Sequence, residues 1–180
     1  MPAKRPVLLI SGPPGAGKTT VAKALAKAAT RPVVHIEGDA FNAFLPLDVK
    51  PPMMRRQRLS AMQAMMAAAR PFSRAGQDTI VDFSIGPWFL PGVMPFLRDT
   101  PLDYVILYPP KAICAARAAA RKDGRMPDYE PYAEFYDAFR TAKGFEDHMI
   151  GEDLGVAALV NRIRLGLGKG RFRVSAKGRP

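Results

Sequence analysis

The chain has 180 residues, 48% of them apolar, and a formal net charge of +11. This length and apolar content suit one domain with a core large enough to fold alone. A single cysteine, Cys114, excludes a disulfide framework and a cysteine metal cage. No apolar run approaches a membrane span, and Lys4 and Arg5 lead into the first expected strand without a signal-peptide pattern, so we expect a cytoplasmic protein.

Expected strands and helices alternate along the chain. The strands are short apolar runs at 7–10, 33–36, 79–81, 104–107 and 148–150. The helices show apolar residues at helical spacing near 20–29, 53–70, 90–98, 111–122, 132–143 and 154–167. This alternation predicts one α/β domain over 1–168, in which helices cover both faces of a parallel sheet and ligands bind at the carboxyl ends of the strands.

Much of the positive charge lies near the C-terminus. Residues 162–179 hold seven basic residues and no acidic one, and we expect a basic tail over 169–180. A basic surface attracts nucleotides and phosphorylated ligands, and it attracts nucleic acid non-specifically. No interleaved aromatic platform accompanies this charge, so nucleic acid is the less favoured partner, and a solvated tail is the favoured explanation of the excess charge.

The strongest motif follows the first expected strand. It consists of Gly12, Pro13, Pro14, Gly15, Ala16, Gly17, Lys18 and Thr19, and Thr20 then opens a helix. A pattern of this kind between a strand and a helix is typical of a phosphate-binding loop. Its glycines let backbone N–H groups turn toward phosphate oxygens, Lys18 adds charge near the β- and γ-phosphates, and Thr19 can offer its hydroxyl to Mg²⁺. These residues therefore predict a nucleoside-triphosphate site.

Carboxylates end the second and third expected strands. Glu37 and Asp39 alternate in an extended segment, so both project toward the phosphate-binding loop. Asp39 is our candidate for orienting or deprotonating an acceptor hydroxyl, and Glu37 for holding a metal-bound water. As alternatives, Asp39 could cap the next segment and Glu37 could be an exposed turn carboxylate. Asp82 resembles a Walker B carboxylate and is expected to hold Mg²⁺ together with Thr19.

Three arginines follow the fourth expected strand. Arg117 and Arg121 are four residues apart and would share a helix face, and Arg125 lies in a Gly-containing lid over about 122–131. Guanidinium groups carried by a lid stabilise the charge of phosphoryl transfer and exclude water. Arg121 and Arg125 are favoured because they flank the lid, and a solvated basic face is the alternative.

Aromatic and flexible side chains remain open to two interpretations. Trp88 would form a wall of an acceptor pocket or belong to the core. An aromatic stripe is expected mainly to pack in the core, at Tyr132, Phe135, Tyr136 and Phe139. Residues 46–52 are expected to form a flap. Residues 46–58 would form either the acceptor side or a helix surface, and they include Met53, Met54, Arg55, Arg56 and Arg58.

These motifs together resemble the small P-loop kinases, a group that includes gluconate and shikimate kinases, chloramphenicol phosphotransferase-like enzymes and kinases related to zeta toxins. The resemblance covers residues 7–167. It implies a three-layer α/β/α P-loop NTPase fold, with a five-stranded parallel sheet of order 2-3-1-4-5 and a short lid. It also implies ATP on the loop, the acceptor hydroxyl at Asp39, and Arg121 and Arg125 over the phosphates. Glu37 stands where several members place a metal-proximal Asp, and no acceptor-specific surroundings are recognisable.

The resemblance therefore implies an ATP- and Mg²⁺-dependent kinase that transfers the γ-phosphate to a hydroxyl of a small molecule. A polynucleotide or nucleoside 5′-hydroxyl kinase is an alternative that the basic charge makes reasonable. A nucleotide-dependent binding or switch protein is an alternative of another class. The chain contains no Asn-Lys-x-Asp motif for reading guanine, which counts against a GTPase switch.

Overall fold

The computed structural model describes residues 3–45, 53–122, 124, 126–175 and 178. Within this part, the parallel strands of the central sheet follow the order β2-β3-β1-β4-β5. Their bounds are β1 (Val7–Ser11), β2 (Val33–Glu37), β3 (Asp78–Asp82), β4 (Leu102–Leu107) and β5 (Met149–Ile150). A short further strand, β6 (Arg173–Val174), pairs antiparallel with β4. The observed order confirms the predicted P-loop NTPase fold.

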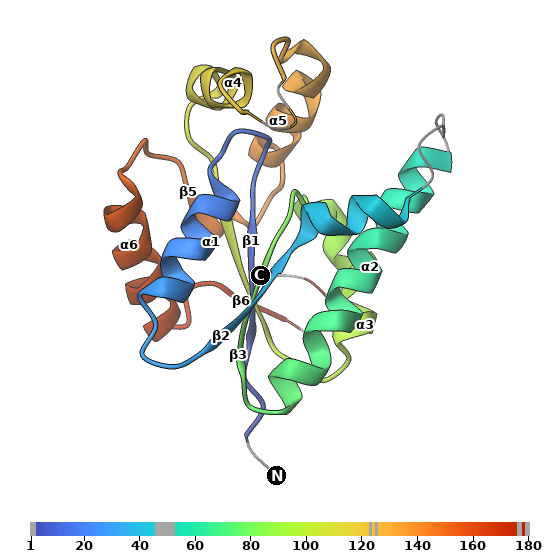
Figure 1. Cartoon of the computed structure of the whole chain (residues 1–180), viewed down its shortest axis with the longest axis vertical. Coiled ribbons are helices and arrows are strands. Elements are labelled where there is room, and N and C mark those ends of the chain that lie inside the picture. Colours follow the sequence, from blue (N-terminus) through green and yellow to red (C-terminus); the bar gives the residue numbers. More distant parts are fainter. Residues whose placement is uncertain (1–2, 46–52, 123, 125, 176–177, 179–180) are drawn as a thin grey trace.

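Helices cover both faces of the sheet, as Figure 1 shows. On one face lie α1 (Lys18–Lys27) and α6 (Val156–Gly168), and on the other α2 (Met53–Arg74) and α3 (Leu90–Leu97). Beyond the carboxyl end of β1 lie α4 (Lys111–Ala119) and α5 (Ala133–Arg140). This arrangement leaves the carboxyl ends of the strands facing α4, α5 and the loops around them.

Each face of the sheet has its own hydrophobic core, and β1 contributes to both. Val7 and Leu9 belong to the core under α2 and α3, whereas Leu8 and Ile10 belong to the core under α1 and α6. Successive side chains of a strand point to opposite faces, so an unbroken apolar run is what a central parallel strand requires. The two cores hold β1 rigidly, and β1 leads directly into the phosphate-binding loop.

The helices α2, α4 and α5 end three or four residues from their predicted positions, and contacts in the structure explain the first two differences. α2 runs through Pro71 to Arg74, because packing of residues such as Met65 and Met66 in the core outweighs the hydrogen bond that a proline removes. α4 ends at Ala119, three residues early, because the chain turns back and the Met126 N–H donates to the Ala118 carbonyl. The flap expected at 46–52 lies outside the described residues.

The basic segment after α6 is partly folded. Phe172 is fully buried, Val174 pairs with Leu102, and Arg173 donates to the Asp103 carboxylate at 2.7 Å. The expectation of a solvated tail is therefore wrong for Phe172 and Val174, because both side chains are buried in the hydrophobic cores, whereas Arg173 is exposed. In the described part of the chain, no helix has both the length and the apolar character needed to cross a membrane.

Candidate functional site

The loop between β1 and α1 has the backbone conformation of an anion-binding nest. Gly12, Gly15 and Gly17 all have positive φ angles, of 140°, 79° and 90°. A Cβ on Gly15 would lie 2.0 Å from the Cys114 carbonyl oxygen, so the loop can approach α4 only with glycine there. The N-terminus of α1 then presents backbone N–H groups that have no partner within the helix, and these can bind phosphate oxygens.

The ammonium group of Lys18 lies beneath this loop. The side chain is buried, and its Nζ donates to the Pro13 carbonyl oxygen at 3.0 Å. Burial, followed by the positive charge of Arg121, lowers the pKa of Lys18 to about 8. Lys18 therefore remains mainly protonated at pH 7 and provides a desolvated positive charge for an anion on the loop.

Asp82 at the end of β3 connects the loop to β2. Its Oδ2 accepts a hydrogen bond from the Thr19 Oγ1 at 2.5 Å, and its Oδ1 lies 2.7 Å from the His35 Nε2. Burial raises the pKa of Asp82 above its usual range, although the hydrogen bonds from Thr19 and His35 oppose this rise. The carboxylate is thus held by partners on both sides, with Thr19 on α1 and His35 on β2.

His35 is a site residue that the motif analysis missed. It precedes Glu37 by two positions in β2, so both side chains lie on the face that bears α1. The parallel register places Glu37 opposite Asp82, which brings the imidazole within reach of that carboxylate. The register between β2 and β3 carries this information, and a search for sequence motifs does not use it.

Thr19 and Asp82 fit a magnesium ion that arrives with a nucleotide. They supply a hydroxyl and a carboxylate oxygen, which are ligand types that Mg²⁺ prefers. Among the described residues, no cluster of three or more His, Cys, Asp or Glu side chains could hold a metal ion alone. Magnesium typically uses one or two carboxylates and completes its coordination with water and substrate phosphates, so this sparse donor set suits it.

Asp39 lies next to this group. It stands in the first turn of the 3₁₀ helix η1 (Gly38–Phe44), whose N-cap residue is Glu37, and no side chain caps that helix. The capping alternative for Asp39 is therefore not what the structure shows. Asp39 instead helps to line a pocket of about 130 Å³, which we call the P-loop pocket, with Gly17, Lys18, Thr19, Asp82 and Arg121.

Of the predicted arginines and Glu37, only Arg121 lines the P-loop pocket in the described part of the chain. Arg121 lines the P-loop pocket, although it follows α4 rather than belonging to it. Arg117 points elsewhere and pairs with Asp153 at 2.7 Å. Glu37 pairs with Lys23 on α1 at 2.5 Å, so its part in metal binding stays a prediction. Arg125 lies outside the described residues.

The segment after the lid is attached to the loop. Tyr129 donates a hydrogen bond from its hydroxyl to the Pro14 carbonyl oxygen at 2.9 Å. Burial raises the pKa of Tyr129 beyond its usual range, so this hydroxyl keeps its proton at neutral pH. The contact joins residues that are far apart in sequence and attaches the segment after the lid to the phosphate-binding loop.

A larger pocket of about 540 Å³ adjoins the first one. The two share Pro14, Phe83 and Ser84, and the larger pocket is further lined by Trp88, Phe89, Tyr132, Phe135, Met62 and Arg58. We call this the aromatic pocket. Tyr136 and Phe139 are buried, as expected for the aromatic stripe, whereas Tyr132 and Phe135 of the same stripe line the pocket. Trp88 therefore lines a pocket, and its part in binding an acceptor stays a prediction.

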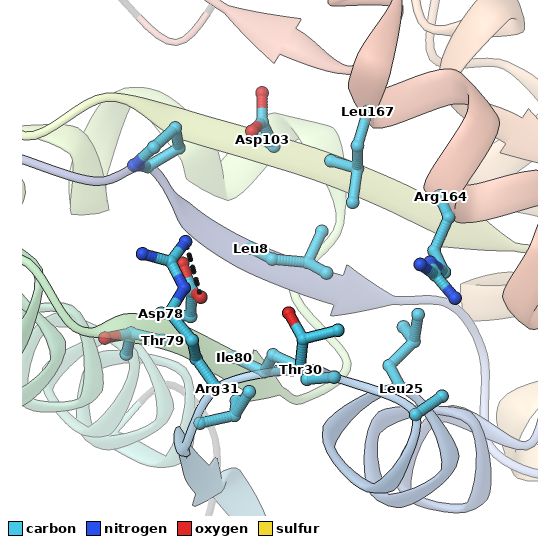
Figure 2. A pocket seen from close by; sticks show the side chains of 14 residues that line it. Leu8, Leu25, Thr30, Arg31, Asp78, Thr79, Ile80, Asp103, Arg164 and Leu167 are labelled. Carbon is cyan, nitrogen blue, oxygen red and sulfur yellow. Dashed lines mark ion pairs between the residues drawn. The ribbon is translucent and has the colours of Figure 1, made fainter.

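Another pocket, of about 310 Å³, lies at the opposite end of the sheet. Figure 2 shows Leu8, Ile80 and Leu25 around it, with Arg31 facing Asp78. The Arg31 and Asp78 side chains pair at 3.5 Å, and Arg5 pairs with the same carboxylate at 2.8 Å. This pocket is formed at the amino ends of the strands, away from the residues that the motifs singled out.

Comparisons with known proteins agree with this geometry. A family model described as an AAA domain matches residues 7–135, which is more than half of the chain. No curated protein matches the chain significantly in sequence.

Three solved structures are similar along nearly their whole lengths. The tunicamycin resistance protein of Deinococcus radiodurans is 22% identical, with a TM-score of 0.68 over 92% of this chain and 96% of that one. The APS kinase of Mycobacterium tuberculosis, in complex with AMPPNP and APS, is 16% identical, with a TM-score of 0.66 over 93% and 99%. A sugar kinase from a Janibacter species is 20% identical, with a TM-score of 0.65 over 91% and 94%. At these identities the likeness shows a common fold, and the matched family model shows that the chain belongs to the AAA domain family, among the P-loop kinases that its motifs resemble.

Proposed function

We propose that the protein is an ATP-dependent kinase that transfers the γ-phosphate to a hydroxyl group of a small molecule. The observation that carries this proposal is the position of Asp39, which lines the same pocket as Lys18 and Thr19. That pocket opens beside the aromatic pocket, whose volume of about 540 Å³ is typical of small-molecule sites. A nucleotide and an acceptor would therefore have adjoining sites, with the Asp39 carboxylate in the lining of the nucleotide site.

Each residue of the P-loop pocket would have a separate role in in-line phosphoryl transfer. Lys18 and the loop amides hold the β- and γ-phosphates, and Mg²⁺ bound at Thr19 and Asp82 would neutralise phosphate charge. Asp39 orients the acceptor hydroxyl and accepts its proton as the oxygen bonds to the γ-phosphorus. The bond to the β–γ bridging oxygen breaks, and ADP leaves. Arg121 stabilises the negative charge on the transferred group.

The neighbouring structures support this assignment by analogy of fold. The Mycobacterium tuberculosis structure holds a nucleotide analogue together with APS, and the Janibacter protein is described as a sugar kinase. A nucleotide-dependent switch would not need an acceptor pocket beside its phosphate site. A polynucleotide kinase needs a channel for a chain, whereas the aromatic pocket has the size of a single small molecule.

The test is ADP formation from ATP, measured with and without hydroxylated metabolites, nucleosides and 5′-hydroxyl oligonucleotides. Asp39→Asn should slow acceptor-dependent turnover by roughly 10²–10⁴-fold and leave ATP affinity nearly unchanged, because it removes the proton acceptor. Asp99→Asn is a suitable control, since this exposed carboxylate pairs with Lys4, far from the site.

Two results would contradict the proposal. One is ADP formation that no acceptor accelerates, which would favour the switch. The other is an Asp39→Asn variant that loses ATP binding as much as turnover, because Asp39 would then serve the nucleotide site or the fold rather than the acceptor.

A further inference from the structure

The described side chains that line the aromatic pocket offer few hydrogen-bonding groups to a molecule with many hydroxyls. Most of them are aromatic or apolar, and none of the lining residues that the structure describes is Asp, Glu, Asn or Gln. The polar side-chain groups of the described lining are the Arg58 guanidinium, the Ser84 and Tyr132 hydroxyls and the Trp88 indole N–H. A sugar acid or polyol buried here would give up several hydrogen bonds to water, and each one left unreplaced lowers affinity by roughly tenfold.

The aromatic wall is held in place by the core. The Trp88 indole contacts Phe135 edge-on at 5.7 Å between ring centroids, and Phe139 at 5.3 Å. Phe139 is fully buried, whereas Trp88 is 38% exposed. A Cβ on Gly86 would lie 2.3 Å from the Trp88 Cζ2, so glycine leaves the space that the indole fills. Trp88 therefore presents a fixed apolar surface to the pocket, and a planar ring can pack on it without rearrangement.

The shared lining shows where the reacting end of an acceptor would lie. Phe83 and Ser84 follow β3 directly and line both pockets, and Asp39 lines the P-loop pocket on the other side of this junction. An acceptor that fills the aromatic pocket must extend its hydroxyl past Phe83 and Ser84 to reach Asp39. The body of the acceptor would thus contact aromatic side chains, and its hydroxyl would contact the Asp39 carboxylate.

We propose that the acceptor is an alcohol whose hydroxyl is carried by a largely apolar, ring-containing body that packs against Trp88 and Phe135. This inference rests on the proposed kinase function and adds the chemical class of the substrate. Sugar acids and polyols do not belong to this class, because most of their surface consists of hydroxyl groups that find few hydrogen-bonding partners along the described lining. Nucleosides do not belong to it either, because the amino and carbonyl groups of a base would find few partners along this lining.

Trp88 is the only tryptophan of the chain, so its fluorescence reports occupancy of the aromatic pocket directly. The experiment titrates the protein, in the presence of MgADP, with 3-phenylpropanol, gluconate and adenosine, and measures the emission of Trp88. ADP formation is then measured with the same three compounds and MgATP. We expect 3-phenylpropanol to change the emission at concentrations at least about tenfold lower than the other two, and to have the highest kcat/KM.

Two variants test the wall itself. Phe135→Ala and Gly86→Ala should each raise the KM for 3-phenylpropanol by about tenfold or more, and the KM for ATP should stay unchanged. Phe72→Ala is the matched control, because Phe72 is 39% exposed, like Trp88, and does not belong to the lining of the aromatic pocket. Circular dichroism and thermal unfolding show whether each variant folds. Gly86→Ala removes none of the side chains that line the aromatic pocket, so it tests the position of Trp88 alone.

The outcomes separate the two proposals. Tighter binding and faster phosphorylation of gluconate or adenosine would overturn the apolar acceptor class and leave the kinase function standing. A Trp88 response to 3-phenylpropanol without phosphorylation of any compound would support the apolar pocket and contradict the kinase function. Equal effects of Phe72→Ala and Phe135→Ala on the KM for 3-phenylpropanol would overturn the assignment of Phe135.

Discussion

Lys18 serves the site at a cost to the stability of the nucleotide-free protein. Its pKa falls from 10.5 in a free lysine to about 8 in the fold because the ammonium group is buried. Between about pH 8 and 10.5 the unfolded chain holds a proton that the folded chain has released, so the free energy of unfolding rises with pH across this window. Below pH 8 both states are protonated, and the full penalty of up to about 3 kcal/mol applies.

Lys18→Met should therefore stabilise the nucleotide-free protein. We expect its free energy of unfolding to exceed that of the wild type by roughly 1–3 kcal/mol at pH 7, and the difference to shrink from about pH 8 to 10.5. The same variant should lose ATP binding, because it lacks the charge that the phosphates require. Urea unfolding at several pH values and nucleotide titration measure the two effects. A less stable variant, or one that binds ATP normally, would contradict this account.

We expect His35 to position the Asp82 carboxylate, since it contacts this carboxylate and is not among the residues that line the P-loop pocket. Because its Nε2 lies 2.7 Å from the Asp82 Oδ1, we expect His35→Ala to raise the Mg²⁺ concentration for half-maximal ATP turnover by roughly 10–100-fold. His148→Gln is a useful comparison, since His148 is a buried histidine whose Nδ1 lies 2.8 Å from the Tyr104 carbonyl oxygen and which does not contact Asp82. If both variants changed the Mg²⁺ requirement equally, general destabilisation rather than the bond to Asp82 would explain the effect.

At the scale of elements, the end of α4 decides which arginine can serve the nucleotide. Arg117 within the helix is held by Asp153, whereas Arg121 just beyond the helix lines the P-loop pocket. The chain leaves the helix at Ala119, and this turn directs Arg121 toward the loop. The hydrogen bond from Tyr129 to the Pro14 carbonyl attaches the segment that follows Arg121 to the phosphate-binding loop.

Arg121→Ala should lower kcat by roughly 10–100-fold and raise the KM for ATP much less, because a charge-assisted hydrogen bond to the transferred group strengthens in the transition state. Arg117→Ala is the matched control on the same helix, and we expect it to leave both constants within about twofold, since its partner is an exposed carboxylate. Steady-state kinetics with the preferred acceptor measure both. Equal kinetics in the two variants would remove Arg121 from the catalytic site.

At the scale of the whole molecule, the chain closes its second core only after α6. Phe172 inserts beneath that helix, against Gly166, and β6 adds a short edge to β4 at its amino end. The C-terminal basic segment therefore includes residues that belong to the kinase domain itself. The predicted boundary between the domain and the tail, after residue 168, stays a prediction.

Phe172→Ala should lower the free energy of unfolding by about 3–5 kcal/mol, because it removes a fully buried aromatic side chain. Leu165 on α6 is 68% exposed, so Leu165→Ala should change the free energy of unfolding by less than about 0.5 kcal/mol. Chemical denaturation of both variants measures the difference. If Phe172→Ala were nearly neutral, the segment after α6 would not belong to the core.

The sequence by itself determined the features that are local along the chain. The alternation of apolar runs specified the parallel fold, and the glycine-rich loop ending in Lys18 and Thr19 specified the phosphate site, because backbone turns and strand periods depend on neighbouring residues. Asp82 could be recognised for the same reason, since it ends an apolar strand. The position of Asp39 after β2 likewise needed only the carboxyl-end rule for parallel sheets.

The tertiary structure decided which residues from distant segments meet. The bond from His35 to Asp82 depends on the register of β2 against β3, and the wall formed by Trp88 and Phe135 depends on how α5 packs over η2 (Pro87–Phe89). The burial of Phe172 depends on the space left beneath α6. Periodicity cannot supply these contacts, because side chains tens of residues apart are brought together only when the packing of both cores sets the spacing of the elements.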